Sequence, residues 1–168
     1  MSIVDLSKQV ALGIDIGGTN TKFGIVNHRG QILDKGAIST EDYQTPEALI
    51  DALYENILPM MKDHGVENMI QGIGIGAPNA NYYKGTIELA PNLPFKGVIP
   101  FAEMITEKFG FPCKMTNDAN AAALGEMLYG AARGMRDFIM ITLGTGVGSG
   151  IVSSGNIIYG HDGFAGEL

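Results

Sequence analysis

Two glycine-rich turns in the sequence could bind the phosphates of a nucleotide. Glycines let the backbone approach a phosphate without a Cβ clash, and successive N–H groups can then donate to its oxygens. The first turn offers Gly17, Gly18, Thr19, Asn20 and Lys22, and the second offers Gly144, Thr145, Gly146 and Gly148. Neither has the GxxxxGKS/T pattern, and a predicted strand follows each turn instead of the helix of a GxGxxG dinucleotide site. Each could be an ordinary hairpin turn, but together they could hold one triphosphate from both sides.

Two aspartates lie where they could serve phosphoryl transfer. Asp15 ends the strand before the first turn, where a carboxylate can hold Mg²⁺ through water and so neutralise a triphosphate. Asp118 begins a predicted helix, where a carboxylate is a good N-cap. If Asp118 also faces a cleft, it can accept the proton of a substrate hydroxyl as that oxygen attacks a γ-phosphate.

Three further polar residues could bind the hydroxyls of a sugar. Asn92 lies in a loop bracketed by Pro91 and Pro94, and Asn117 directly precedes Asp118. Asparagine amides present donors and acceptors that suit adjacent hydroxyls, and the Glu167 carboxylate could accept two hydroxyl hydrogen bonds. The alternatives are a turn-forming asparagine and a frayed acidic terminus.

An antiparallel meander should position the first turn. Apolar runs separated by turns predict strands at 10–16, 21–26 and 31–38. A helix with Pro46 at its first position follows, and Pro59 should kink or end it near Leu58. The next buried strand, 69–76, contains Gly72, Gly74 and Gly76, which suggests a close backbone approach.

The same plan of strand, glycine turn and strand occurs again in the second half. Helices are predicted from Pro100 to Gly110 and at 118–129, around a short strand at 113–116. Strands at 138–143, 149–152 and 157–159 then form a second meander around the second glycine turn. We infer an internal duplication in which the two turns occupy equivalent places.

Composition and charge exclude several classes of partner. The 168 residues are 45% hydrophobic and carry a net charge of −7, and the 11 Lys and Arg residues form no cluster, so we expect no nucleic-acid partner. No apolar run is long enough to span a membrane and no leader precedes the first strand, which predicts a cytoplasmic protein with no membrane partner. Cys113 is the only cysteine, which excludes an internal disulfide and a cysteine-based zinc site.

Taken together, three segments resemble the ROK family of bacterial sugar kinases and related repressors. These segments are 12–19, 117–122 and 143–148, and their order and spacing are highly specific. The resemblance implies an α/β actin-like ATPase (ribonuclease H-like) fold, with a mixed sheet, an antiparallel meander and crossover helices. It also implies ATP and Mg²⁺ as cofactors, a hexose substrate and a homodimer. Its implied roles are Asp118 as base, Asn92, Asn117, Asp118 and Glu167 as sugar ligands, and Gly76-Ala77-Pro78 as a loop lining the same pocket.

The resemblance also implies that the chain is the N-terminal portion of a longer protein. Family members are about twice as long, so residues 1–117 would form the small α/β domain and 118–168 the start of an incomplete larger domain. In the family, the acid equivalent to Glu167 is followed by a Gly-His pair, and a cysteine cluster comes later. Neither is present, so a structural zinc could use only residues beyond Leu168.

The expected function is ATP-dependent phosphorylation of glucose or an N-acetylhexosamine at the 6-hydroxyl. The 168-residue chain by itself should have little or no activity, because positioning requires both walls of the cleft. The alternative is the sugar-sensing domain of an ROK-type regulator, although such regulators carry a helix-turn-helix before the first phosphate motif. A kinase that uses polyphosphate is a third possibility, since both turns would serve that donor equally well.

Overall fold

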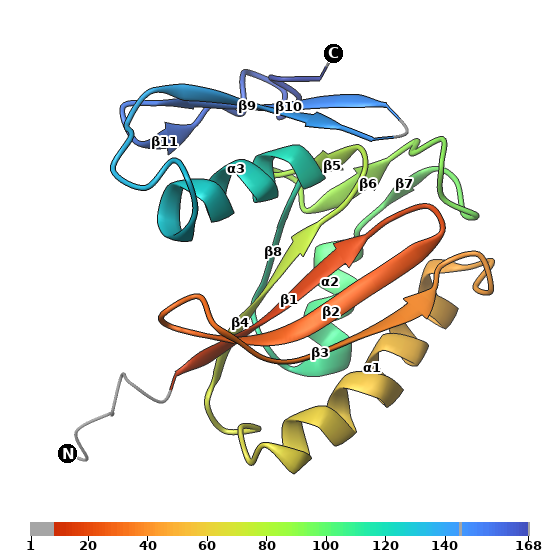
Figure 1. Ribbon diagram of the computed structural model, residues 1–168. Helices are drawn as coiled ribbons and strands as arrows, with labels where there is room; N and C mark the ends of the chain where they lie inside the picture. Colours follow the sequence, from red (N-terminus) through yellow and green to blue (C-terminus); the bar gives the residue numbers. More distant parts are fainter. Residues whose placement is uncertain (1–8, 145, 168) are drawn as a thin grey trace.

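The computed structural model describes residues 9–144 and 146–167, and its main sheet has five strands in the order β3-β2-β1-β4-β8 (Figure 1). Strands β1, β4 and β8 are parallel, whereas β1, β2 and β3 form the predicted antiparallel meander. The strands are β1 (Val10–Ile16), β2 (Asn20–Asn27), β3 (Ile32–Ser39), β4 (Ile70–Gly76) and β8 (Cys113–Thr116). The expected mixed sheet is therefore present.

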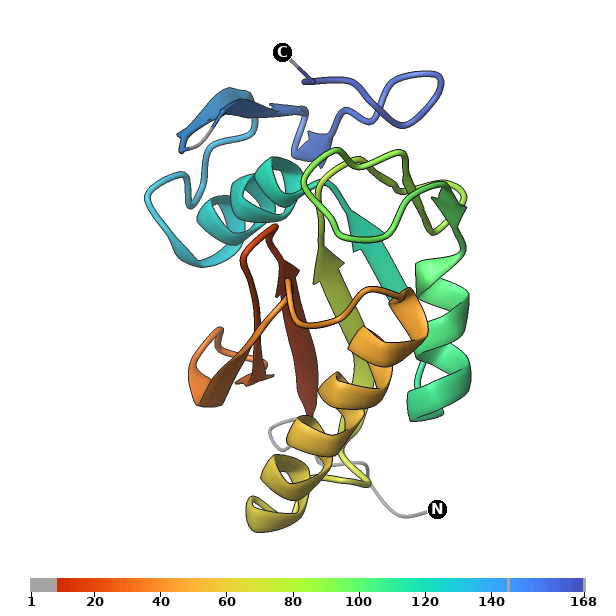
Figure 2. The same cartoon turned by 90° about the vertical axis from the view of Figure 1, so that its right-hand side faces the viewer.

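Two neighbouring helices cover one face of this sheet (Figure 2). Side chains on a strand alternate between faces, and Leu12 and Ile14 of β1 are buried together with Leu53 and Ile105 from the helices. Within the described part of the chain, no helix is long and apolar enough to cross a membrane. The covering helices are α1 (Pro46–Asp63) and α2 (Phe101–Phe109).

The sequence predicts that Pro59 kinks or ends helix α1 near Leu58, with Gly65 as the latest stop. The helix does not end near Leu58 but continues to Asp63, before Gly65. Proline removes one backbone donor, which would have bonded the carbonyl of Glu55. Both Pro59 and Glu55 are exposed, so water can bond that carbonyl. On the opposite side, Met61 is buried in the core and favours continuation of the helix.

A small three-stranded sheet between β4 and α2 was not predicted. Its order is β5-β6-β7, and its strands have only two or three residues, which is too short for an alternating pattern to be recognised. The loop that contains Asn92 connects β6 and β7 of this small sheet. The strands are β5 (Ala80–Asn81), β6 (Thr86–Glu88) and β7 (Val98–Ile99).

The second meander forms its own sheet, in the order β11-β10-β9, and packs on helix α3 (Figure 1). A Cβ on Gly150 would lie 2.6 Å from the Cβ of Ala123, so helix and sheet are in close contact there. Helix α3 also contacts β4 and thereby joins the two sheets. These elements are α3 (Asp118–Tyr129), β9 (Phe138–Leu143), β10 (Val147–Ser153) and β11 (Asn156–Ile157).

Candidate active site

Helix α3 begins beside the end of the main sheet, and Asn117, not Asp118, is its N-cap. The Asn117 Oδ1 atom accepts hydrogen bonds from the backbone N–H groups of Ala119 at 2.7 Å and Asn120 at 3.4 Å. The prediction that Asp118 caps the helix is therefore wrong. Asp118 is the first helical residue and is exposed, although its Oδ1 also accepts from Ala119 N at 2.7 Å. Its position at the mouth of the site does not depend on a capping role.

Asp118 and Asp15 approach each other across Gly76, the last residue of β4. A Cβ on Gly76 would lie 3.5 Å from the Asp118 Cα atom, 3.9 Å from an Asp15 carboxylate oxygen and 3.3 Å from the Ala121 Cβ atom. The predicted close backbone approach is thus real at Gly76, and also at Gly72, where an added Cβ would lie 3.0 Å from the Pro112 carbonyl oxygen. It is wrong for Gly74, where an added Cβ would meet nothing within 4 Å.

The two aspartates line an open groove of about 1220 Å³ between the main sheet and α3. Lys22 and Thr142 also line it, so the groove brings together residues from the two meanders. Gly74 faces this same space, which explains the room around it. Of the predicted site residues, the groove wall includes Asp15, Lys22, Gly76 and Asp118.

The charges at the groove favour a bound cation. Burial raises the pKa of Asp15, the negative charge of Asp118 raises it further, and Lys22, which is paired with Asp15 across β1 and β2, opposes both effects. A Mg²⁺ ion carried by a triphosphate usually keeps several waters and takes only one or two protein carboxylates, which suits Asp15. Among residues 9–144 and 146–167 there is no group of three or more His, Cys, Asp or Glu side chains arranged to hold a metal.

Glu167 lies close to both Asn117 and Asp118. Its Oε1 atom accepts a hydrogen bond from the Asn117 Nδ2 atom, and its backbone pairs with Gly148 at the start of β10. Burial raises the pKa of the Glu167 carboxyl, the charge of Asp118 raises it further, and the bond from Asn117 opposes the rise. Three of the predicted sugar ligands, Asn117, Asp118 and Glu167, are therefore neighbours.

Asn92, the fourth predicted sugar ligand, lies against the first glycine turn. That turn is closed by a bond from Gly17 N to Asn20 O at 3.0 Å, and a Cβ on Gly18 would lie 2.8 Å from the Asn92 carbonyl oxygen. The predicted phosphate turn and the predicted sugar loop are therefore in contact.

The loop that contains Asn92 is held by Lys96, which the sequence reasoning missed. The Lys96 ammonium donates to the carbonyls of Ala90 at 3.1 Å, Pro91 at 2.7 Å and Leu93 at 2.8 Å. A lysine beside a proline-rich loop was the only signal in the sequence. Sequence reasoning normally places such a lysine side chain in solvent. Its three acceptors leave no sequence signal, because all three are backbone carbonyls.

The second glycine turn begins above the start of α3. Gly144 N donates to Gly146 O at 3.0 Å, and Thr145 lies outside the described residues. A Cβ on Gly148 would lie 2.7 Å from Thr142 Oγ1 and 3.2 Å from the Ala119 Cβ atom, so this end of the turn is close to Asp118. A joint grip of both turns on one triphosphate stays a prediction.

The loop after β4 reaches the same end of the main sheet. Ala77 is buried, and its N–H donates to the carbonyl of Thr116 at 3.0 Å, directly before Asn117. Pro78 is half-buried. The Gly76-Ala77-Pro78 loop is therefore anchored beside the start of α3, and its role in a sugar pocket stays a prediction.

The fold and this arrangement place the molecule among the α/β proteins with an actin-like ATPase fold. The chain belongs to the ROK family, whose model matches residues 11–168. The chain is 39% identical over 166 residues to a glucokinase of Halalkalibacterium halodurans, covering 97% of this chain and 50% of the relative. The chain thus spans about half the length of the curated relatives it matches.

A solved structure supports the same relationship. The chain superimposes with a TM-score of 0.82 and 34% identity on a ROK family glucokinase from Streptomyces griseus, crystallised with glucose and AMPPNP, covering 94% of this chain and 49% of that one. The family also includes regulators: a xylose repressor of Caldicellulosiruptor bescii is 32% identical over 170 residues, covering 99% of this chain and 42% of the repressor.

Proposed function

We propose that the full-length protein transfers the γ-phosphoryl group of ATP to a hexose, with Asp118 as the general base. One observation carries the proposal: Asp118 is close to two sets of polar groups. It lines the groove together with Asp15 and Lys22 of the first meander, and its charge also raises the pKa of Glu167, which bonds Asn117. A base in this position could serve a phosphate donor and a sugar at the same time.

The reaction assigns each group a role. The oxygen of the sugar 6-hydroxyl attacks the γ-phosphorus, the bond from that phosphorus to the β–γ bridging oxygen breaks, and ADP leaves. Asp118 accepts the hydroxyl proton as the new bond forms. Because the transition state is loose, the main contribution of Asp118 is to orient the hydroxyl. Glu167, Asn117 and Asn92 bind the other hydroxyls, and Gly76-Ala77-Pro78 lines the pocket.

The glycine turns and Asp15 hold the donor. Backbone N–H groups of the two turns donate to phosphate oxygens, and Lys22 adds a positive charge beside them. Asp15 would hold Mg²⁺ through water, and the cation would supply charge neutralisation of the triphosphate. Glucokinase relatives that are 38% and 39% identical support a glucose-type hexose as substrate, and the related structure with glucose and AMPPNP supports ATP as donor. A homodimer is proposed from the family resemblance alone.

A regulator is the second candidate, because a xylose repressor aligns along nearly the whole chain. A sugar-sensing domain requires the Asn117–Glu167 pair but not a base facing a donor. Asp15 and Lys22 lie close to Asp118, which favours the kinase, because a kinase needs groups that hold the phosphate donor beside the base. Sugar-dependent consumption of ATP by the full-length protein separates the two candidates, and a parallel assay with polyphosphate identifies the donor.

The decisive variant is Asp118→Asn in the full-length protein. It keeps the side-chain volume and removes the base, so kcat should fall by about 10²- to 10⁴-fold while sugar affinity measured by calorimetry changes by less than about twofold. Asp137→Asn is the matched control, since this exposed carboxylate bonds Ser153 and Ser154 at the far end of β9. Retention of most of the kcat by Asp118→Asn would refute the assignment of the base.

A further inference from the structure

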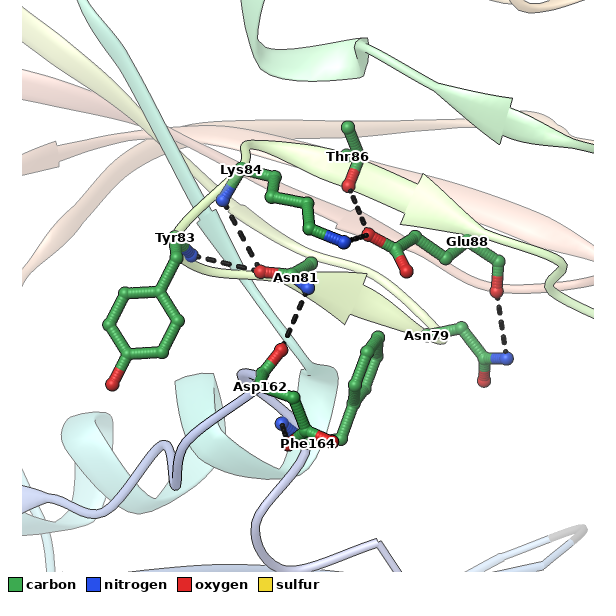
Figure 3. A network of polar contacts seen from close by, with 8 residues as sticks. All are labelled: Asn79, Asn81, Tyr83, Lys84, Thr86, Glu88, Asp162 and Phe164. Carbon is green, nitrogen blue, oxygen red and sulfur yellow. Dashed lines mark hydrogen bonds and ion pairs between the residues drawn. The ribbon is translucent and has the colours of Figure 1, made fainter.

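Asn81 is a buried side chain that ties two distant parts of the chain together (Figure 3). It lies on β5 with 0% of its surface exposed. Its Oδ1 atom accepts from the N–H groups of Tyr83 at 3.1 Å and Lys84 at 3.3 Å, which closes the turn after β5. Its Nδ2 atom donates to the carbonyl of Asp162 at 2.9 Å, 81 residues further along the chain.

The partner of Asn81 is the segment 159–167, which we call the strap. Except for the single bridge at its end, the strap has no regular secondary structure. Two backbone turn bonds, from Ala165 N to Tyr159 O at 3.0 Å and from Glu167 N to Phe164 O at 3.2 Å, shape it locally, and side-chain contacts attach it to the rest of the chain. Its Gly163 has φ of 95°, and a Cβ there would lie 2.8 Å from the Asn81 Oδ1 atom. Only glycine adopts this backbone conformation readily and also leaves room for the Asn81 amide.

Two aromatic contacts fix the beginning of the strap on the same turn. The rings of Tyr82 and Tyr159 stack with centroids 4.0 Å apart and planes 3° from parallel. The Tyr83 hydroxyl donates to the carbonyl of Gly160 at 2.9 Å. Asn81 and its two neighbours therefore hold the strap from Tyr159 to Gly163.

The strap ends at Glu167, four residues after Gly163. Ser149 Oγ donates to the carbonyl of Gly166 at 2.6 Å, and Glu167 then bonds Asn117. The strap thus has one attachment on the small sheet and one on β10, and Glu167 lies at its end. A shift of the strap at Gly163 would move the Glu167 carboxylate relative to Asn117 and Asp118.

We propose that Asn81 is a positioning residue for sugar binding, which acts by holding the strap so that Glu167 faces Asn117 and Asp118. The proposal rests on the proposed sugar-kinase function. It assigns Asn81 to the sugar because the strap places the Glu167 side chain on Asn117. Within the described residues the strap bonds neither Asp15 nor the first glycine turn, and it meets the second glycine turn through the backbone of Glu167 at Gly148.

The test compares Asn81→Asp and Gly163→Ala with wild type in the full-length protein. Asn81→Asp keeps the oxygen that accepts from Tyr83 and Lys84, but it replaces the amide that donates to Asp162 with a second oxygen. Gly163→Ala adds a Cβ atom to the strap that would clash with the Asn81 side chain. Loss of one buried hydrogen bond should raise the sugar KM roughly tenfold, with the KM for ATP changed less than about twofold.

The matched control is Asn79→Asp, which makes the same chemical change in the turn directly before β5. Asn79 Nδ2 donates at 3.0 Å to the carbonyl of Glu88, which lies within the small sheet and does not touch the strap (Figure 3). The sugar KM of Asn79→Asp should stay within about twofold of wild type. If Asn81→Asp does not fold, Gly163→Ala and Tyr83→Phe decide, and an unchanged sugar KM in both would overturn the proposal.

A double-mutant cycle with Glu167→Gln separates positioning from simple stability. If Asn81 acts through Glu167, Asn81→Asp should raise the sugar KM little further in the Glu167→Gln background. Additive effects, or equal increases in the KM values for sugar and ATP, would overturn the proposal while leaving the kinase intact. A wild-type protein without any hexose-dependent phosphoryl transfer would instead refute the proposed function.

Discussion

The main sheet and the β11-β10-β9 sheet share an antiparallel meander but bury very different amounts of apolar surface. The first core includes residues of β1, β2, β4 and β8 and of both covering helices. The second consists of Ala123, Val152 and Ile157, with partly buried neighbours from α3, β9 and the strap. Since burying one large aliphatic side chain stabilises a fold by about 1.5–3 kcal/mol, the first region has far more stabilisation of its own.

The outer face of the second sheet shows the same difference. Its exposed apolar residues are 53% to 82% exposed, and β9 has no strand partner on its outer edge within the described residues. Exposed apolar surface beside an open strand edge favours association. We call the exposed apolar residues of this face the outer strip; they are Ile139, Ile141, Leu143 and Val147. The site lies where the well-packed region meets the thinly packed one.

The largest expected effect concerns the 168-residue chain expressed by itself. It should fold around the first core but turn over hexose far more slowly than about 1 s⁻¹, a typical lower bound for kinases, because phosphoryl transfer depends on accurate positioning from both regions. A coupled assay with glucose, N-acetylglucosamine and N-acetylmannosamine measures this. Turnover above about 1 s⁻¹ by a monomeric chain would show that α3 and the β11-β10-β9 sheet of this chain alone are ordered well enough for catalysis.

The same preparation should self-associate through the outer strip. Ile141→Lys should shift light scattering toward the monomer, because a charge on this face opposes burial. Leu33→Lys is the control, since Leu33 is an exposed residue of β3 on the other sheet. Equal scattering from both variants would place the association elsewhere.

The sequence predicts features that depend on neighbouring residues better than features that depend on contacts between distant parts of the chain. Strand β1 has the predicted bounds and α3 the predicted length, because periodic apolar residues and terminal glycines are local signals. The predicted domain boundary between residues 117 and 118 depends instead on contacts between distant parts of the chain. The two cores fall on either side of it, but the contacts of Asn81 with the strap cross it.

The sequence predicted which residue types form the candidate site, but it was less informative about the local structural role of each residue. The sequence indicated a polar residue as the cap of α3, but two adjacent candidates made Asp118 and Asn117 indistinguishable without backbone dihedrals. Asn81 was not predicted, because an asparagine next to Tyr82 and Tyr83 suggests a turn. Its buried partner is 81 residues away, and no local pattern encodes such a contact.

A matched pair of core substitutions compares the two regions directly. Ile57→Ala on α1 should lower the free energy of unfolding by about 2–5 kcal/mol, because Ile57 is 1% exposed in the large core. Ile157→Ala on β11 removes the same atoms from the small core and should cost less, since its neighbours are only partly buried and can collapse. Urea denaturation of the 168-residue chain measures both. Equal losses would mean that the two regions unfold as one cooperative unit.

The smallest expected effect is a pH dependence of sugar binding through Glu167. Its pKa is raised above the usual 4.5 by burial and by Asp118, so ionising Glu167 costs folding stability as pH rises through the raised pKa. Sugar binding has the opposite sign, because only the carboxylate can accept two hydroxyl hydrogen bonds. The sugar KM of the full-length protein should therefore increase as pH falls through this pKa, with a midpoint above 4.5.

Glu167→Gln provides the control for this pH effect, since the amide does not titrate. The variant should have a higher sugar KM than wild type at neutral pH and should lose the Glu167 step in the profile of KM against pH. The KM for ATP is measured in parallel, because Asp15 also has a raised pKa and its titration should appear in that profile in both proteins. If the sugar KM of Glu167→Gln keeps the wild-type pH profile, the titrating group lies elsewhere and the thinly packed region does not supply the sugar carboxylate.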